Sequence, residues 1–556
     1  MKLTNKYIIA ILISITFITF FPSLKNDFVN WDDDIYVLQN PDIREISSAS
    51  VSNMFSSEYV GLYLPLTIFS YAINYSIGEL NPFGYHLLNL ILHIFSTIIL
   101  YLLIKKLSSN ISIAFFVALL FAIHPLRVES VVWISQRKDV LYVFFYLLSL
   151  LSFTNYLFAK TNNLKWYFAS LIFFIISLFS KTSAVTLPLI ILALAYYIDK
   201  SSIKKVFVKL IPYFLISLIF GIITYSVLKT GGNIYKFEEN YSLLDQICLG
   251  TYSFIFYIYK LVFPFDLSPT YYFPLKSNGW LPIPYYISVL VLIILIYLVY
   301  KFRKNKIIIT GSLIYLFGIF FFLQVIASGR VVTADRYAYI AHIGLLFIIG
   351  SLLYTLFRKN SKIFIYFTLV IGIIFSILTS RYSMIWKTGE SLFTHSILKN
   401  ENKSLGYINR GLAHYYGFTE KNKIDYNKAY QDFDKAISIN KNDAEGWFNR
   451  GNCFMNFQKI NEAENDFDKT ISLDSLHYKA WNNRGLVYAY KGNFDMAMKY
   501  YNHSIYLKNT FSDAYSNIAF VYLNNGNNKM ACEYFEKSLK LGSKTAGHYL
   551  EQYCKK

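Results

Sequence analysis

The chain has 556 residues, of which 55% are hydrophobic, 19% aromatic and only 16% charged. Soluble domains carry about 25% charged residues, so this composition excludes a purely soluble protein, a disordered chain and a fibrous one, and favours a polytopic membrane protein. The formal net charge is +19, which invites a nucleic-acid-binding interpretation, but the placement of the charge argues against it.

Eleven long apolar segments predict an all-α membrane domain over residues 1–380. They are 7–22, 86–104, 111–123, 139–158, 166–180, 184–199, 206–228, 283–300, 307–326, 337–357 and 363–379. A spanning helix needs roughly 20 residues, so we expect the shorter segments to extend into their neighbours. The first segment has no small-residue cleavage site after it, which favours an uncleaved helix. A further stretch, 246–264, has Lys260 near its middle, and we expect it to lie at the interface or re-enter.

The distribution of basic residues predicts the orientation of these spans. If the N-terminus is cytoplasmic, the connecting segments on its side hold 17 Lys and Arg residues and a single acid, Asp199. Such an excess marks cytoplasmic loops. The prediction is therefore an integral membrane protein whose C-terminal region lies on the non-cytoplasmic side. The positive net charge is then explained by the basic cytoplasmic segments, and no nucleic-acid partner is expected.

Three consecutive carboxylates, Asp32, Asp33 and Asp34, lie in the outer loop after the first span. Adjacent carboxylates repel one another, so some benefit must offset the repulsion. The residues leave three interpretations open. They are a general base with a raised pKa beside an ionised neighbour, a divalent metal site with oxygen ligands, and a solvated acidic turn that caps a helix.

A second outer loop, between the third and fourth spans, is also rich in charge. It carries His124, Arg127, Glu129, Arg137, Lys138 and Asp139. Charged groups against apolar helices are costly, so recognition of an anionic phosphate is the functional interpretation. Ordinary anchoring of helix ends at the interface is the structural alternative.

A third cluster, at the outer end of the tenth span, holds Arg330, Asp335, Arg336 and Tyr337. The predicted topology places it on the same face as the first two clusters, together with Lys181. This convergence of carboxylates and cations favours an active site. There is no Walker loop, no GxGxxG, no HExxH and no GxSxG, so nucleotide hydrolysis, dinucleotide redox chemistry and familiar protease chemistry have no support.

The region after about residue 381 repeats itself. Trp447, Trp481 and Tyr515 are each 34 residues apart, and an earlier unit begins at Tyr407 with about six extra residues near 417–423. This period and pattern resemble the tetratricopeptide repeat. We predict a linker or helix at 381–404 and an α-solenoid of about four repeats at 405–556, which would bind a protein or peptide or only cap the membrane domain. The four cysteines form no CxxC pair, so neither a disulfide framework nor a zinc site is expected.

The order of these motifs resembles the transmembrane and tetratricopeptide-repeat (TMTC) O-mannosyltransferases, which belong to the GT-C class of glycosyltransferases. The matching stretches are 28–34 with Asn40, 63–67, 81–86, 124–139 and 335–337. The resemblance implies an inverting transfer of mannose or a similar hexose from a polyprenyl-phosphate donor to a hydroxyl acceptor. The acceptor would be a Ser or Thr of a protein held by the repeats, on the non-cytoplasmic face of a prokaryotic plasma membrane or an ER-like membrane.

The resemblance also implies roles for individual residues. The family's Asp-Asp pair falls on Asp32 and Asp33, with Asp34 as an extra acid that leaves the register open by one. The donor phosphate would be bound by Arg127, Arg137, Lys138 and Arg336. The supporting residues would be His124, Glu129, Asp139, Asp335 and Tyr337. A lipid-linked sugar is the expected donor, and a divalent metal stays possible.

Two other functions fit the same features. One is a transferase that acts on a cell-envelope glycan or a lipid, with the repeats recruiting a partner. The other is a non-catalytic membrane scaffold or assembly factor, in which the repeats bind protein. A scaffold should tolerate neutral substitutions of Asp32 and Asp33, whereas a transferase should not.

Overall fold

The computed structural model describes residues 5–159, 163–230, 241–323, 331–420, 422–543 and 545–554. Arg330 lies outside them. The chain divides into two compact units, Met1–Lys387 and Thr388–Lys556, and the division falls inside the predicted 381–404 linker segment. The fold is all-α, apart from one two-stranded pairing in the described residues.

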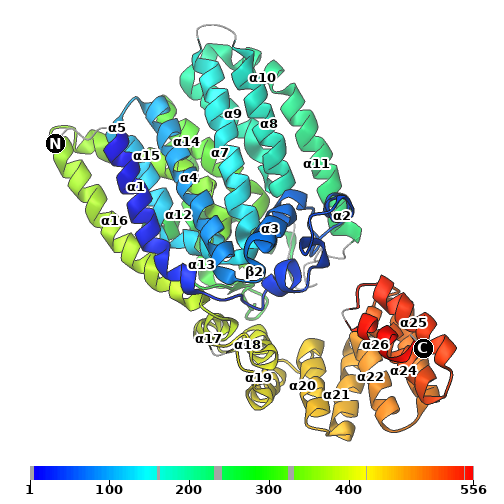
Figure 1. The fold of residues 1–556 in the computed structure, drawn as a ribbon. Coiled ribbons are helices and arrows are strands. Elements are labelled where there is room, and N and C mark those ends of the chain that lie inside the picture. The colour runs from blue at the N-terminus through cyan, green and yellow to red at the C-terminus, as the bar shows by residue number, and fades with distance from the viewer. Residues whose placement is uncertain are drawn as a thin grey trace. The chain divides into compact units, whose positions relative to one another are not determined.

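The first unit is a bundle of helices that run side by side (Figure 1). Each predicted apolar segment forms a helix. They are α1 (Asn5–Phe20), α4 (Pro82–Ser108), α5 (Ile111–Ile123), α7 (Arg137–Phe158), α8 (Leu164–Ser180), α9 (Leu187–Ile198), α11 (Ile211–Thr230), α13 (Ile283–Lys301), α14 (Lys306–Ile319), α15 (Ala341–Leu356) and α16 (Ser361–Ser383). Further helices connect them, namely α2 (Ser48–Ser56), α3 (Pro65–Gly78), α6 (Val128–Val132), α10 (Ile203–Lys209) and α12 (Leu243–Val262).

Six helical segments are long and apolar enough to cross a membrane, or seven if the bent pair Ile111–Ile123 and Pro125–Val132 is one span. They indicate an integral membrane protein. The remaining apolar helices, α8, α9, α14 and α15, are shorter; 17 residues of helix span only about 26 Å. Length and composition therefore support six or seven crossings, and the predicted eleven depend on counting these four as spans.

Asparagine side chains begin four of these helices. Asn81, Asn110, Asn305 and Asn360 precede α4, α5, α14 and α16, and each side-chain oxygen accepts a hydrogen bond from the backbone amide two residues later, at 2.9–3.2 Å. These caps satisfy amides that have no partner within the helix. The turns between the apolar segments are thereby defined by local sequence.

The helix α12, which covers the ambiguous 246–264 stretch, is not among the candidate spans. Lys260 in its last turn is buried and donates to the backbone carbonyl of Phe265 at 2.5 Å. Its ammonium group is therefore satisfied by the protein.

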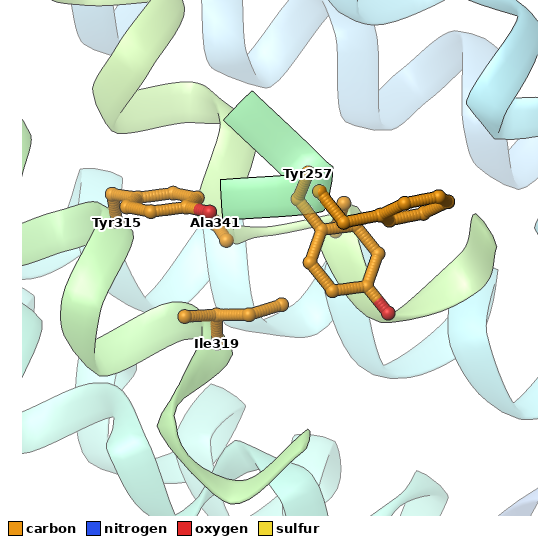
Figure 2. Close-up of a cluster of buried hydrophobic side chains, with 6 residues drawn as sticks. Tyr257, Tyr315, Ile319 and Ala341 are labelled. Carbon is orange, nitrogen blue, oxygen red and sulfur yellow. The ribbon is translucent and has the colours of Figure 1, made fainter. Parts of the chain in front are cut away.

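A buried cluster joins α12, α14 and the start of α15 beneath the 335–338 turn (Figure 2). Tyr257, Tyr315, Ile319 and Ala341 belong to it. The Tyr257 hydroxyl donates to the carbonyl of Ala334 and accepts from its amide, both at 3.1 Å. Nearby, β1 (Tyr271–Tyr272) pairs antiparallel with β2 (Val331–Thr333). These contacts fix the backbone that leads into the 335–338 turn.

The second unit consists of helix pairs with the predicted repeat. The pairs are α18 (Ser404–Tyr416) with α19 (Tyr426–Ile439), α20 (Ala444–Asn456) with α21 (Ile460–Leu473), α22 (Tyr478–Tyr490) with α23 (Phe494–Leu507) and α24 (Ser512–Asn524) with α25 (Asn528–Lys540). The helix α17 (Gly389–Lys399) precedes them and α26 (Ala546–Tyr553) follows. The structure thus has four helix pairs in the region where about four repeats are predicted, and the extra residues of the first lie between α18 and α19.

Glycines let the two helices of a pair approach closely. A Cβ at Gly451 would lie 2.7 Å from Cε1 of Phe467, and a Cβ at Gly485 would lie 2.6 Å from Cε1 of Tyr501. Real side chains do not approach so closely without displacement. The small residue at this step of the repeat is therefore required by an aromatic ring on the paired helix.

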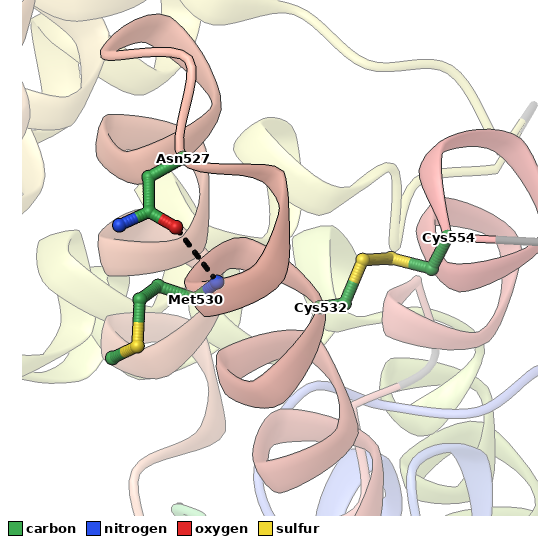
Figure 3. Close-up of a disulfide and its surroundings, with 4 residues drawn as sticks. All are labelled: Asn527, Met530, Cys532 and Cys554. Carbon is green, nitrogen blue, oxygen red and sulfur yellow. Dashed lines mark hydrogen bonds between the residues drawn. A yellow bond between two sulfur atoms is a disulfide. The ribbon is translucent and has the colours of Figure 1, made fainter.

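The expectation that no disulfide forms is wrong. Cys532 on α25 is bonded to Cys554 at the end of α26 (Figure 3). The two cysteines are 22 residues apart, and only the packing of α26 against α25 brings them together. Their spacing in the sequence therefore does not predict the disulfide. At the start of α25, Asn527 accepts a hydrogen bond from the Met530 amide at 3.1 Å.

Candidate functional site

The first acidic loop is held against the second outer loop by Asp33. Its side chain is buried, and its two oxygens accept hydrogen bonds from the amide of Val29 at 3.0 Å, the amide of Ser135 at 2.9 Å and the Ser135 hydroxyl. Burial raises the pKa of Asp33 to about 7, against the opposing effect of these hydrogen bonds. Asp33 therefore ties two loops together from a position closed to solvent.

Asp32 differs from its neighbour in exposure. Its side chain is 22% exposed, and its Oδ2 lies 3.8 Å from Nζ of Lys138, which is only 6% exposed. The Lys138 ammonium also lies 4.6 Å from the centre of the Tyr36 ring. Asp34 begins a π-helical turn, Asp34–Leu38. Of Asp32 and Asp33, only Asp32 combines accessibility with a neighbouring cation.

Two ion pairs lie around the contact between Asp32 and Lys138, and each pair joins segments that are distant in sequence. Arg336 donates to Glu129 through its guanidinium, and through its backbone amide at 3.0 Å. Lys181 pairs with Asp139. Both acids are almost fully buried, whereas Arg336 and Lys181 keep 17% and 13% of their side-chain surface exposed. The acids therefore orient cations that still reach solvent.

Aromatic rings line the same region. Trp31, Trp133 and Trp386 stack on one another, with ring centres 4.9 Å apart for the first two and 5.4 Å for the last two. The guanidinium of Arg336 lies 5.7 Å from the Trp133 ring and 4.9 Å from the Tyr337 ring. These contacts fix its direction on two sides.

Asp335 lies next to Arg336 in sequence but is enclosed. Its carboxyl accepts hydrogen bonds from the hydroxyls of Tyr271 at 2.9 Å and Tyr382 at 3.2 Å. Burial, together with the nearby Glu129 carboxylate, raises the pKa of Asp335 to about 8, against the two hydrogen bonds. This residue supports the turn that carries Arg336.

The structure does not bring Arg127 to the cluster of exposed cations. Its guanidinium is fully buried, lies 5.2 Å from the Phe121 ring and 5.1 Å from the Tyr339 ring, and bonds to His342 at 3.2 Å. His124 is also buried, and its Nε2 contacts the carbonyl oxygen of Leu261 at 3.0 Å. Both residues therefore lie inside the bundle, where Nε and Nη1 of Arg127 have no hydrogen-bond partner among the described residues.

Arg137 is enclosed in the same way. It donates to Asn89, to the hydroxyl of Ser70 at 3.3 Å and to the carbonyl of Tyr85 at 2.8 Å, and it has no exposed surface. A guanidinium held by three protein acceptors has little capacity left for a phosphate. Both Arg127 and Arg137 are thus enclosed in the structure, and their binding of phosphate stays a prediction.

Within the described parts of the chain, no three His, Cys, Asp or Glu side chains are grouped as metal ligands. Asp33, Glu129 and Asp139 are each engaged by protein donors or cations. The residues that sequence reasoning missed are Ser135, Tyr271, Tyr382 and Trp386. Ser135 lies inside a quoted motif, but the other three belong to segments with no motif.

Comparison with known proteins finds a family model and several curated relatives. The tetratricopeptide repeat family model matches residues 478–511 and 512–543. Protein O-mannosyl-transferase TMTC1 of Mus musculus is 35% identical over 143 residues, which cover 24% of this chain and 15% of the mouse protein. Protein O-mannosyl-transferase F38B6.6 of Caenorhabditis elegans is 28% identical over 281 residues, 47% of this chain and 39% of the worm protein.

TMTC3 of Homo sapiens is 31% identical over 156 residues, 26% of this chain and 17% of the human protein. The matches thus cover well under half the length of these relatives. Among solved structures, the crystal structure of MamA matches 28% of this chain and 89% of its own, with 23% identity and a TM-score of 0.24. The chain is a distant homologue of the TMTC protein O-mannosyltransferases and carries C-terminal tetratricopeptide repeats.

Proposed function

We propose that this distant homologue of the TMTC transferases is an inverting glycosyltransferase that moves a hexose from a polyprenyl-phosphate donor to a hydroxyl acceptor. The homology supports glycosyltransferase activity and a sugar donor. One observation carries the assignment of the site, namely the accessible carboxylate of Asp32 beside Lys138, with Arg336 and Lys181 as further partly exposed cations in neighbouring ion pairs.

In this proposal Asp32 is the general base. Its carboxylate takes the proton of the acceptor hydroxyl as the hydroxyl oxygen forms a bond to the anomeric carbon. The bond between that carbon and the phosphate oxygen breaks, and the lipid phosphate leaves with the electron pair. Attack opposite the leaving group inverts the anomeric configuration. Asp33 is a positioning residue, because it is closed to solvent and its oxygens already accept three hydrogen bonds.

The departing phosphate needs positive charge and no strong acid. Arg336, Lys138 and Lys181 supply that charge in this proposal, in place of Arg127 and Arg137. Fixed cations that face developing negative charge stabilise a transition state because they need no reorganisation. The pairs with Glu129 and Asp139 hold two of the three cations in place.

The same proposal includes a topology of eleven crossings. The six long helices, the bent pair and the four shorter apolar helices coincide with the eleven predicted segments. The Cys532–Cys554 disulfide supports a repeat region outside the cytoplasm, because disulfides persist in oxidising compartments. Both the candidate site and the repeats would then be non-cytoplasmic. Cytoplasmic labelling of a cysteine introduced at Ser277 would contradict this arrangement.

The repeats support a protein acceptor. Tetratricopeptide repeats imply protein binding, since stacked helix pairs form an extended surface for another chain. We propose that a Ser or Thr in an extended segment of the bound protein is the acceptor, and that mannose is the first donor sugar to test.

The test uses the purified full chain with polyprenyl-phosphate sugars of known anomeric configuration and Ser/Thr-containing peptides. We expect release of the lipid phosphate with one donor, and a glycopeptide whose anomeric signal in NMR spectra is inverted. The Glu45→Gln variant, which removes an exposed acid of the same outer loop, should behave as wild type. Retention of configuration, or no release with any donor and acceptor pair, would contradict the proposal.

A further inference from the structure

A groove runs between α9 and α14, and its chemistry has no part in the proposed transfer. Its volume is about 770 Å³, within the range of ligand pockets. The walls are apolar and include Leu189, Leu192, Ile309, Leu313 and Phe317. A polar solute would gain little from such walls, whereas a hydrocarbon chain would be well accommodated.

One end of the groove is a cationic rim, formed by Lys200, Arg303, Lys304 and Lys306. All four side chains are exposed. In the described ranges, none of them pairs with a carboxylate within 4.0 Å, and Lys306 makes only a 3.4 Å contact with the carbonyl of Tyr197. Four cations at one pocket edge repel one another, and an anion bound between them would relieve that repulsion.

The closest acid in sequence does not neutralise the rim. Asp199 adjoins Lys200, but its carboxylate accepts hydrogen bonds from the amide of Ser201 at 2.9 Å and from the Ser201 hydroxyl at 2.7 Å. These hydrogen bonds, and to a smaller extent the nearby Lys306 and Lys205, hold the pKa of Asp199 below its usual value, so it carries one negative charge against four positive ones. The net charge of the rim stays positive.

The rim is separate from the candidate transfer site. Lys181 precedes α9, with only the turn 182–186 between them, and Lys200 follows the other end of the same helix. The twelve residues of α9 alone span about 18 Å. By the distribution of charge, the rim lies on the predicted cytoplasmic side, where anionic phospholipids attract basic segments.

We propose that this groove is a binding site for one anionic diacyl phospholipid, with its phosphate on the rim and an acyl chain along Leu192, Ile309 and Leu313. The apolar groove matches the acyl chain of such a lipid, and the cationic rim matches its phosphate. A soluble anion would not use the apolar groove, and a zwitterionic lipid would bring a cation to the rim.

Native mass spectrometry of the detergent-solubilised full chain tests this proposal, with dioleoyl phosphatidylglycerol as the probe. We expect one phosphatidylglycerol to bind more tightly than phosphatidylcholine. The variant Arg303→Gln/Lys304→Gln should lower its affinity by about 30-fold, since each cation near an anionic lipid contributes roughly fivefold. The matched control is Arg358→Gln/Lys359→Gln, another exposed basic turn on the predicted cytoplasmic side, and its affinity should change less than twofold.

A second variant tests the apolar groove. Leu313→Trp fills the groove and leaves all four cations in place, so it should lower phosphatidylglycerol binding while the melting temperature stays near that of wild type. Equal binding of phosphatidylcholine, equal loss in the two charge variants, or preference for undecaprenyl phosphate would each overturn the assignment.

Discussion

Removal of the Arg336 side chain should separate the structural role of its ion pair from its catalytic role. Glu129 is 1% exposed and accepts hydrogen bonds from the guanidinium and the backbone amide of Arg336. The substitution Arg336→Ala would leave a buried carboxylate with one hydrogen bond. Loss of one partner from a buried pair costs about 3–5 kcal/mol. We expect the free energy of unfolding to fall by about that amount.

A second substitution isolates the origin of this loss. Glu129→Gln removes the buried charge, so the double variant Arg336→Ala/Glu129→Gln should recover most of the lost stability. Its rate of lipid-phosphate release should stay about 10²–10³-fold below wild type, because the cation that faces the leaving group is still absent. Unfolding in mixed micelles, followed by tryptophan fluorescence, reports the stability.

The exposed Arg358→Ala variant provides the control, and it should change the stability by less than about 0.5 kcal/mol. Two results would contradict these two roles of Arg336. One is an Arg336→Ala protein as stable as wild type. The other is a double variant that regains transfer activity along with stability, since the guanidinium would then be dispensable for the chemistry.

Three further predictions concern other parts of the chain. Burial raises the pKa of Asp33 to about 7 from its usual value near 4, so its contribution to stability is fully present below about pH 4 and is lost as the pH rises to about 7. The melting temperature of wild type minus that of Asp33→Asn should therefore fall between about pH 4 and 7 and level off above, and a constant difference would contradict this. Replacing Cys532 and Cys554 by serine should destabilise the repeats by about 3 kcal/mol in chemical denaturation, with no further effect of a reductant on the variant. Gly451→Val should cost about 1–3 kcal/mol by overpacking in the same assay, whereas Gly547→Ala, whose added Cβ would lie at an ordinary contact distance of 3.7 Å from Cδ1 of Leu539, should be close to neutral.

The helices were accessible from sequence because their signals are local. Apolar runs flanked by capping asparagines define the helices of the membrane unit, and the 34-residue period defines the helix pairs of the repeats. The number of membrane crossings was harder to predict from the sequence. The segments 166–180 and 184–199 predict spans, but the helices there are short, and their depth in a bilayer depends on tilt and neighbours.

The candidate site was predicted in outline but not in detail. The three charged clusters do meet, through Asp33 with Ser135 and through Glu129 with Arg336. Sequence could not separate Arg127 from Arg336, because each lies in a polar turn beside an apolar helix. The difference is tertiary, since aromatic rings enclose the first and leave the second partly exposed.

Hydrogen-bond partners from distant parts of the sequence could not be predicted, because they too depend on the tertiary structure. The tyrosines that hold Asp335 come from residues 271 and 382, and neither position carries a local signal that points to a carboxylate. Nor could spacing show that Asp33 is closed to solvent while Asp32 is open, since the two are adjacent.

In the proposed mechanism, Asp32 removes the proton of the acceptor hydroxyl. A single-turnover measurement with saturating polyprenyl-phosphate sugar and acceptor peptide compares wild type with Asp32→Asn, and donor binding is measured separately. We expect a rate about 10²–10⁴-fold lower in the variant, with donor affinity within twofold of wild type. A rate within a few-fold of wild type would show that another group takes the proton.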